Sequence, residues 1–131
     1  MITAKLVTYR GLYRTIEVDS INLPSVEGRR GILPNHMPIM IPVEIGIMET
    51  VADGQKKRYA ISDGMFYFEN NRATLLADTI EDTSEIDRQR ARLAQKKAQK
   101  KLETSSEEFE IERARVALQK AINRINAAEG D

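Results

Sequence analysis

Apolar and polar residues alternate along much of the first 80 positions of the chain. Ile2, Ala4 and Leu6 are separated by single residues of other kinds, and Ile16 and Val18 are separated by a glutamate. An alternation with a period of two is typical of β-strands that bury one face. The pattern predicts short strands at residues 2–7, 14–21, 39–43, 45–51, 57–62, 65–69 and 73–77.

Turn-forming residues separate several of these strands. Asp53-Gly54, Asp63-Gly64 and Asn70-Asn71 favour the positive φ angles that tight hairpins require. No run before residue 80 has the length and period of a helix that could cross between parallel strands. The pattern therefore predicts an antiparallel β-sandwich or barrel.

The stretch from Leu23 to Pro42 is the longest that we predict to be irregular. It holds all four prolines of the chain and two of its glycines. Pro42 fits an edge strand or a bulge, but not the interior of a central strand. We expect a rigid loop here, and such loops commonly present a surface to a partner.

The chain contains no proline and no glycine from Met65 to Glu129. From Ala91 onward, apolar residues within each expected helix recur at spacings of three and four, as in amphipathic helices. We expect a first helix to begin within Thr83–Asp87, with Ser84 as its cap and Asp87 in a capping-box position. The apolar positions of this helix are Ile86, Ala91, Ala94, Ala98 and Leu102.

A second helix is expected after a turn at residues 103–106. Ser105 and Glu108 offer another capping box, and Gly130 is a suitable C-terminal stop. The two helices predict an antiparallel hairpin, so the expected class is α+β: a β-sandwich docking domain at 1–83 and a helical hairpin at 84–131. The apolar seam of the second helix is Ile111, Ala114, Leu118, Ala121, Ile125 and Ala128.

Both helical seams consist largely of alanine, which buries little area at about 25 cal/mol per Å². We therefore expect the hairpin to be marginally stable. A marginal element suits a switch between two arrangements that differ by a few kcal/mol. Two structural helices that never move would show the same periodicity, so the pattern alone does not choose between the two interpretations.

The amino-acid composition limits which functions the protein can have. Twenty basic and twenty acidic residues cancel, and there is no cysteine. The basic run from Arg88 to Lys101 lacks interleaved aromatic residues, which disfavours nucleic-acid binding. The absence of cysteine excludes a thiolate metal site and a cysteine nucleophile. No apolar run approaches the roughly 18 residues of a membrane span, so we expect a soluble chain.

No catalytic constellation is visible in the sequence. His36, the only histidine, has no nucleophile or metal-ligand partner at useful spacing, and we interpret it as a structural loop residue. No phosphate-loop motif follows the glycines near it. An acidic group lies at the predicted junction, and we interpret it as a solvated linker with helix-start charges, not as a metal site. Its members are Asp78, Glu81, Asp82, Glu85 and Asp87.

Three stretches together resemble the epsilon subunit of F-type rotary ATP synthases, over essentially the whole chain. The first is EGRRGILPNHMP at residues 27–38. The second is SDGMF at 62–66, followed by ATLLADT at 73–79. The third is EIDRQRA at 85–91, which opens the alanine-rich hairpin. In this order and spacing the three stretches are highly specific.

The resemblance implies a non-catalytic regulatory subunit of the bacterial enzyme. The sandwich would bind the gamma subunit and the ring of membrane c subunits, coupling proton-driven rotation to the catalytic head. In the family the hairpin either folds on the sandwich or extends along gamma into the alpha/beta head, where it hinders ATP hydrolysis. The chain would lie on the cytoplasmic face of the cell membrane, attached only through the complex.

The resemblance also implies candidate site residues. The loop that contacts the c ring and gamma would include Glu27, Gly28, Arg29, Arg30 and His36. Arg29-Arg30 stands where the family usually has an acidic or apolar pair, so we hypothesise compensating acidic residues on the partner ring.

A second implied site is the ATP-binding signature of some bacterial epsilon subunits, with ATP as a regulatory ligand. Asp87 would accept a hydrogen bond from the adenine amino group, and the basic residues would neutralise phosphate charge. Lys97 and Lys120 stand where arginine is usual, and lysine lacks arginine's planar fork. Asp87 and Arg90 are equally compatible with ordinary helix positions. The matching residues are Glu81, Ile86, Asp87, Arg90, Ala91, Lys97, Lys120 and Arg124.

Two alternatives from other classes remain at this stage. An unrelated adaptor would use the same sandwich and hairpin to bind a protein or nucleic acid, and co-purification with gamma separates it from a stalk subunit. A small ATP-consuming enzyme would need a phosphate loop, a magnesium site and a base, none of which the sequence offers.

Overall fold

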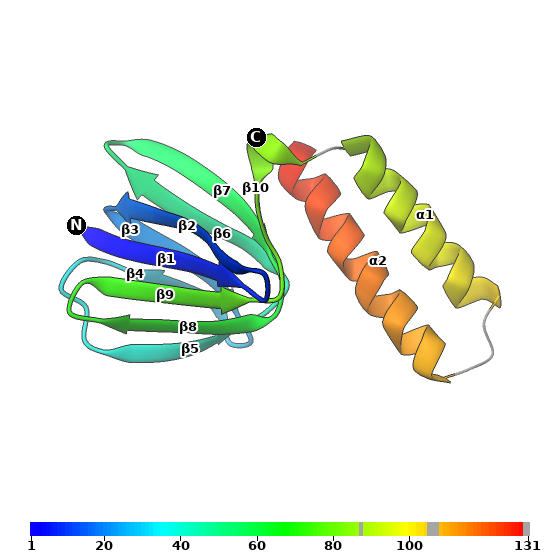
Figure 1. Cartoon of the computed structure of the whole chain (residues 1–131), viewed down its shortest axis with the longest axis horizontal. Helices are drawn as coiled ribbons and strands as arrows, with labels where there is room; N and C mark the ends of the chain where they lie inside the picture. Colours follow the sequence, from blue (N-terminus) through cyan, green and yellow to red (C-terminus); the bar gives the residue numbers. More distant parts are fainter. Residues whose placement is uncertain (87, 105–107, 130–131) are drawn as a thin grey trace. The chain divides into compact units, whose positions relative to one another are not determined.

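The computed structural model describes residues 1–86, 88–104 and 108–129. The chain divides into two compact units, Met1–Asp82 and Thr83–Asp131. Figure 1 shows strands in the first unit and a pair of helices in the second. The predicted fold class, a β-sandwich or barrel followed by a helical hairpin, is confirmed.

The strands of the first unit form one curled sheet. The strand order is β10-β7-β6-β3-β5-β8-β9-β1-β2, and β4 pairs with β3 outside this path. Most pairs of neighbouring strands are antiparallel, as predicted, but β1 and β9 pair in parallel. The strands are β1 Ile2–Thr8, β2 Gly11–Val18, β3 Ser20–Ser25, β4 Gly28–Ile32, β5 Ile39–Val43, β6 Gly46–Ala52, β7 Gln55–Ile61, β8 Gly64–Glu69, β9 Arg72–Ala77 and β10 Ile80–Asp82.

The alternating residues form the core of this sheet. Ile2, Ala4 and Leu6 of β1 are buried, while Lys5 between them is exposed. Curling of the sheet brings one face of every long strand together around these side chains. The buried core comprises Ile2, Ala4, Leu6, Val18, Ile21, Leu23, Ile32, Ile41, Val43, Met48, Tyr59, Ile61, Phe66, Phe68, Ala73, Leu75, Ala77 and Ile80.

Two of the three predicted tight turns have the expected backbone. Asp53 and Gly54 have φ angles of 52° and 74°, and Asn70 and Asn71 have φ angles of 51° and 60°. These pairs join β6 to β7 and β8 to β9. The prediction for Asp63-Gly64 is wrong, because neither of these residues is among those with positive φ.

The predicted irregular stretch from residue 23 to residue 42 is largely wrong. β3 and β4 form a hairpin there, with Leu23 opposite Arg30 and Ser25 opposite Gly28. Only residues 33–38 lie outside strands between β4 and β5. Pro24 fits within β3 because that strand changes partners near it, pairing with β6 up to Asn22 and with β5 at Ser25. The amide hydrogen that proline lacks is therefore not needed for a continuous ladder.

The second unit contains a 3₁₀ turn, Thr83–Glu85, and two helices, α1 Arg88–Thr104 and α2 Glu108–Glu129. The α-helix begins at Arg88, four residues after Ser84, and a 3₁₀ turn occupies the start that we predicted. This turn is closed by a hydrogen bond from the Ile86 amide to the Thr83 carbonyl at 3.4 Å. The predictions for Asp87, Ser105 and Gly130 fall outside the described residues.

The helices bury mainly alanine, as we predicted from the spacing of their apolar residues. Ala94, Leu102 and Leu118 are only half-buried, and Ala127, which the predicted seam did not include, is fully buried. Large apolar residues elsewhere on the helices, such as Leu93, are exposed. The side chain of Ala128 falls outside the described set. The buried apolar residues described in this unit are Ile86, Ala91, Ala98, Ala114, Ala121 and Ala127.

Candidate functional site

The segment between β4 and β5 contains a tight turn. The His36 amide donates to the Leu33 carbonyl at 3.2 Å, which closes a four-residue turn. Pro34 occupies its second position, and Asn35 occupies the third with a φ of 66°. Proline followed by a residue of positive φ is the signature of a type II turn. The turn leaves Leu33 and Met37 highly exposed, at 63% and 70%.

The imidazole of His36 is held by packing within this segment. Its Nδ1 lies 2.7 Å from the Met37 carbonyl oxygen. Its ring meets the Phe68 ring edge-on, with centroids 6.0 Å apart and an interplanar angle of 89°. Phe68 belongs to the core of the sandwich, so His36 connects the exposed turn to that core. These contacts are those of a structural residue.

The other candidate contact residues lie on the β3–β4 hairpin. Gly28 opens β4 just after the two-residue turn of the hairpin, and its φ of 111° suits glycine. The Arg29 guanidinium donates to the Asn22 side chain and to the Ile47 carbonyl, the latter at 2.6 Å. Arg29 is thus bound to the sandwich itself. Arg30 makes an exposed ion pair with Glu27 at 3.8 Å, a kind of contact that contributes about 0–1 kcal/mol.

Six of the eight candidate nucleotide residues lie on three elements, β10, α1 and α2. Glu81 is half-buried in β10, opposite Ala60 of β7. On α1, Ala91 is fully buried, while Arg90 is exposed. Ile86 is largely buried before α1, and Asp87 falls outside the described residues. Arg124 of α2 is half-buried.

Among the described residues, the two candidate lysines line two different hollows. Lys97 lines a groove of about 330 Å³ between α1 and α2, together with Lys101 and Arg113. The other residues that line this groove are alanines of both helices. Lys120 lines a different hollow on α2, beside Val116.

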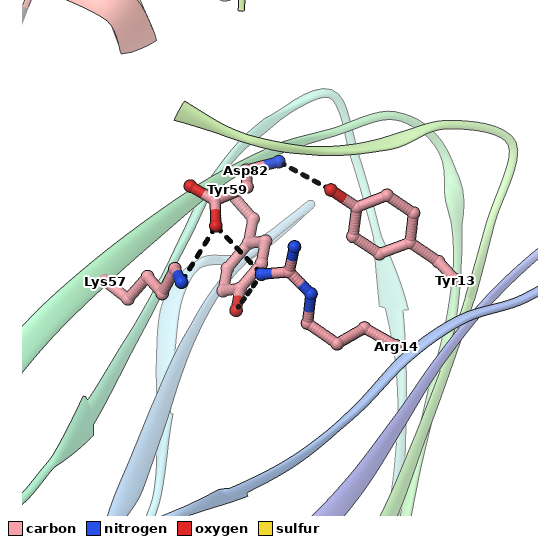
Figure 2. Close-up of polar contacts among 5 residues, drawn as sticks. All are labelled: Tyr13, Arg14, Lys57, Tyr59 and Asp82. Carbon is pink, nitrogen blue, oxygen red and sulfur yellow. Dashed lines mark hydrogen bonds and ion pairs between the residues drawn. The ribbon is translucent and has the colours of Figure 1, made fainter. Parts of the chain in front are cut away.

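A buried charge cluster that the sequence did not reveal lies at the end of the first unit. Figure 2 shows the Asp82 carboxylate facing Arg14 and Lys57. Its Oδ2 lies 2.8 Å from Arg14 Nη1 and 2.9 Å from Lys57 Nζ. The Asp82 amide donates to the Tyr13 hydroxyl at 3.1 Å, and Arg14 also reaches the Tyr59 hydroxyl. Asp82 is only 2% exposed, so its interpretation as part of a solvated linker is wrong.

This cluster joins the two edge strands of the sheet. β2 carries Tyr13 and Arg14, and β10 carries Asp82, and these strands end the sheet on opposite sides. Side chains therefore close the sandwich where the backbone ladder does not. The hydrogen bond to Asp82 raises the pKa of Lys57 and the pKa of Arg14 above their usual ranges, because it favours their charged forms.

Comparison with known proteins covers both units. Residues 1–83 match the model of the ATP synthase delta/epsilon chain β-sandwich domain, and residues 84–129 match that of its long α-helix domain. The chain belongs to the ATP synthase delta/epsilon chain family. Among this family, the chain is 44% identical to the ATP synthase epsilon chain of Caldicellulosiruptor bescii, across 86% of this chain and 82% of that one. It is 36% identical to that of Desulforamulus reducens, across 95% and 94%.

Solved structures support the same fold. A chain in the structure of the Euglena gracilis mitochondrial ATP synthase, OSCP/F1/c-ring, matches with a TM-score of 0.78 at 22% identity. The match covers 93% of this chain and 78% of that one. A chain of the Tetrahymena thermophila mitochondrial ATP synthase central stalk and c-ring matches with a TM-score of 0.57 at 10% identity, across 98% and 94%.

Family membership explains why no catalytic set emerged. A delta/epsilon chain is a non-catalytic subunit of ATP synthase. Among the residues that the structure describes, no helix has the length and apolarity to span a membrane. One stretch that carried the resemblance has a structural explanation in this chain. The Ser62 hydroxyl accepts hydrogen bonds from the Thr79 amide and hydroxyl at 2.7 and 2.9 Å, which fixes β8 beside the end of β9.

Proposed function

We propose that this delta/epsilon chain is the central-stalk subunit that couples rotation of the c-subunit ring to the catalytic head. The sandwich would bind the gamma subunit and the ring, and the hairpin would reach the alpha/beta head when it extends. The match of both units to the family, with bacterial epsilon chains as relatives, supports this role. The chain would then be a peripheral component on the cytoplasmic face of a bacterial membrane, serving ion transport and ATP synthesis.

We further propose that the hairpin inhibits ATP hydrolysis by changing its arrangement. The contrast between the two cores supports this proposal. The sandwich buries large side chains such as Phe66, Leu75 and Tyr59, whereas the helices bury alanine. An alanine seam contributes little burial energy, so the hairpin can rearrange while the sandwich stays folded.

Truncation after residue 83 tests the inhibitory role. ATP synthase assembled with residues 1–83 is expected to hydrolyse ATP several-fold faster than enzyme assembled with the full chain. The truncated chain keeps every residue of the sandwich core, so coupled proton pumping is expected to persist. Hydrolysis rates and ATP-driven pumping by the two enzymes give the measurement. Equal hydrolysis rates would contradict the inhibitory role without affecting the coupling role.

A regulatory ATP site on the hairpin is the finer part of the proposal. Arg90 and Lys97 lie on α1 two turns apart, and Lys120 and Arg124 lie one turn apart on α2. These cations supply charge that can neutralise a triphosphate. ATP would stabilise whichever hairpin arrangement binds it more tightly, by RT ln(1 + [ATP]/Kd).

Calorimetric titration of the isolated full chain with ATP tests this site. The wild type is expected to bind, and the double variant Asp87→Ala, Arg90→Ala is expected to lose at least about tenfold in affinity, because a charge-assisted contact and an adenine contact are both removed. Lys96→Ala with Glu103→Ala is the matched control, since it also removes one charge of each sign from the helical unit. Indistinguishable heats for wild type and the Asp87 variant would refute the site.

A further inference from the structure

Two asparagines from distant parts of the chain form a reciprocal amide pair. Asn35 lies in the turn between β4 and β5, and Asn71 lies in the turn between β8 and β9, 36 residues away. The Asn35 backbone amide donates to Asn71 Oδ1 at 2.6 Å. The Asn71 side-chain amide donates to Asn35 Oδ1 at 3.0 Å.

Both residues have a backbone conformation that is uncommon outside glycine. The φ angles of Asn35 and Asn71 are 66° and 60°. Asparagine tolerates this left-handed region better than most residues, and its short amide can bond to nearby groups. Glycine would meet the backbone requirement equally well but has no side-chain amide, so it could supply neither Asn71 Oδ1 and Nδ2 nor Asn35 Oδ1. The pair therefore accounts for asparagine, as distinct from glycine, at both positions.

Asn71 also forms a backbone hydrogen bond to the sheet. Its carbonyl accepts a hydrogen bond from the Thr3 amide of β1 at 3.0 Å. The β8–β9 hairpin on which it lies is paired over six residues on each strand, including Phe68 opposite Ala73. One partner of the amide pair is thus part of the rigid sandwich, and the other is part of an exposed segment.

From these contacts we infer that Asn71 is a positioning residue for the segment at 33–38. The segment has no strand ladder of its own, and the contacts described for it connect it to β8 and to the β8–β9 turn. His36 packs on Phe68 at one point, and Asn35 bonds to Asn71 at the other. Two attachments prevent the segment from rotating about either one, so the direction in which it presents Leu33 and Met37 is fixed. This inference rests on the proposed contact role of the segment for its effect on assembly.

The matched variants are Asn71→Gly and Asn70→Gly. Both glycines keep the positive φ of the turn without strain. Only Asn71→Gly removes the amide pair, because Asn70 takes no part in it. We follow exchange of the Asn35 backbone amide hydrogen by NMR on the full chain. The exchange is expected to accelerate about tenfold or more in Asn71→Gly and to stay unchanged in Asn70→Gly. An Asn35 amide that exchanges equally slowly in all three proteins would overturn the inference.

Assembly gives the second measurement. Full-length variants are titrated onto ATP synthase depleted of this subunit, alongside the surface variant Leu33→Ser, Met37→Ser. We expect about tenfold weaker association for Asn71→Gly and for the surface variant, and unchanged association for Asn70→Gly. If the surface variant binds weakly while Asn71→Gly binds as wild type, the positioning role is overturned. If both bind as wild type, the proposed contact role of the segment fails, and the positioning role for assembly fails with it.

Discussion

Asp82→Asn is expected to lower the free energy of unfolding of the sandwich by about 3 kcal/mol. The substitution preserves shape but leaves Arg14 and Lys57 facing a neutral amide at a buried position. Removing one partner of a fully buried ion pair costs about 3–5 kcal/mol. The lower end applies here because the Arg14 and Lys57 side chains are 29% and 51% exposed and can regain water.

Thermal and urea unfolding of the full chain measure this effect, with Asp63→Asn as the matched control. Asp63 is exposed in the same unit, so the same change of charge is expected to alter stability by less than about 0.5 kcal/mol. For Asp82→Asn we expect a decrease in Tm of about 10 °C or more. A decrease no larger than that of the control would show that the cluster contributes nothing to stability.

The cluster also has a pH signature. The pKa of Lys57 is raised in the folded state, so its contribution to stability is complete below the unfolded pKa of lysine. That contribution is lost as the pH rises through the folded pKa. Wild-type stability should therefore fall in this alkaline range, and Asp82→Asn should show a smaller fall. The comparison between the two proteins isolates the contribution of the Asp82 carboxylate to this fall, because the other groups of the cluster are the same in both.

Local backbone chemistry was the most predictable part of this fold. The Asp53-Gly54 and Asn70-Asn71 turns follow from which residues tolerate positive φ, a property of single residues. The alternation in β1 follows from the two faces of a strand. β3 and β4 were not predicted, because Pro24 and the glycines at 28 and 31 are typical of loops. Their strand structure depends on pairing with distant strands, because β3 changes its partner from β6 to β5 around Pro24.

The charge cluster was beyond prediction from the sequence for a related reason. Asp82 belongs to an acidic run, and Arg14 and Lys57 are ordinary members of charged strands. Only closure of the sheet brings β2 and β10 together, and no local pattern encodes that closure. The resemblance named candidate contact residues by position, but it did not show that Arg29 is bound to Ile47 while Arg30 pairs with an exposed glutamate. The hypothesis of acidic partner residues therefore applies more directly to Arg30.

Glycine is required at position 64, but not for the reason that the sequence suggested. The sequence suggested that Asp63-Gly64 forms a turn, yet Gly64 lies at the start of β8, opposite Ala77 of β9. A Cβ atom on Gly64 would overlap the Leu76 carbonyl oxygen and would lie 2.7 Å from the Ala77 Cα. These are backbone atoms of the paired strand, so the clash is relieved only by separating β8 from β9. The requirement for glycine here comes from a close approach between strands and not from φ.

Gly64→Ala is therefore expected to lower the free energy of unfolding by about 3 kcal/mol or more, at or beyond the upper end for overpacking. Gly31→Ala is the matched control, because Gly31 also lies in a strand, has no positive φ, and would have nothing within 4 Å of an added Cβ atom. We expect that control to be neutral or stabilising by up to about 1 kcal/mol, since alanine reduces the entropy of the unfolded chain. Urea unfolding of the two variants gives the comparison. Equal stabilities would mean that β9 can shift away from β8, which the hydrogen bonds of Thr79 to Ser62 should resist.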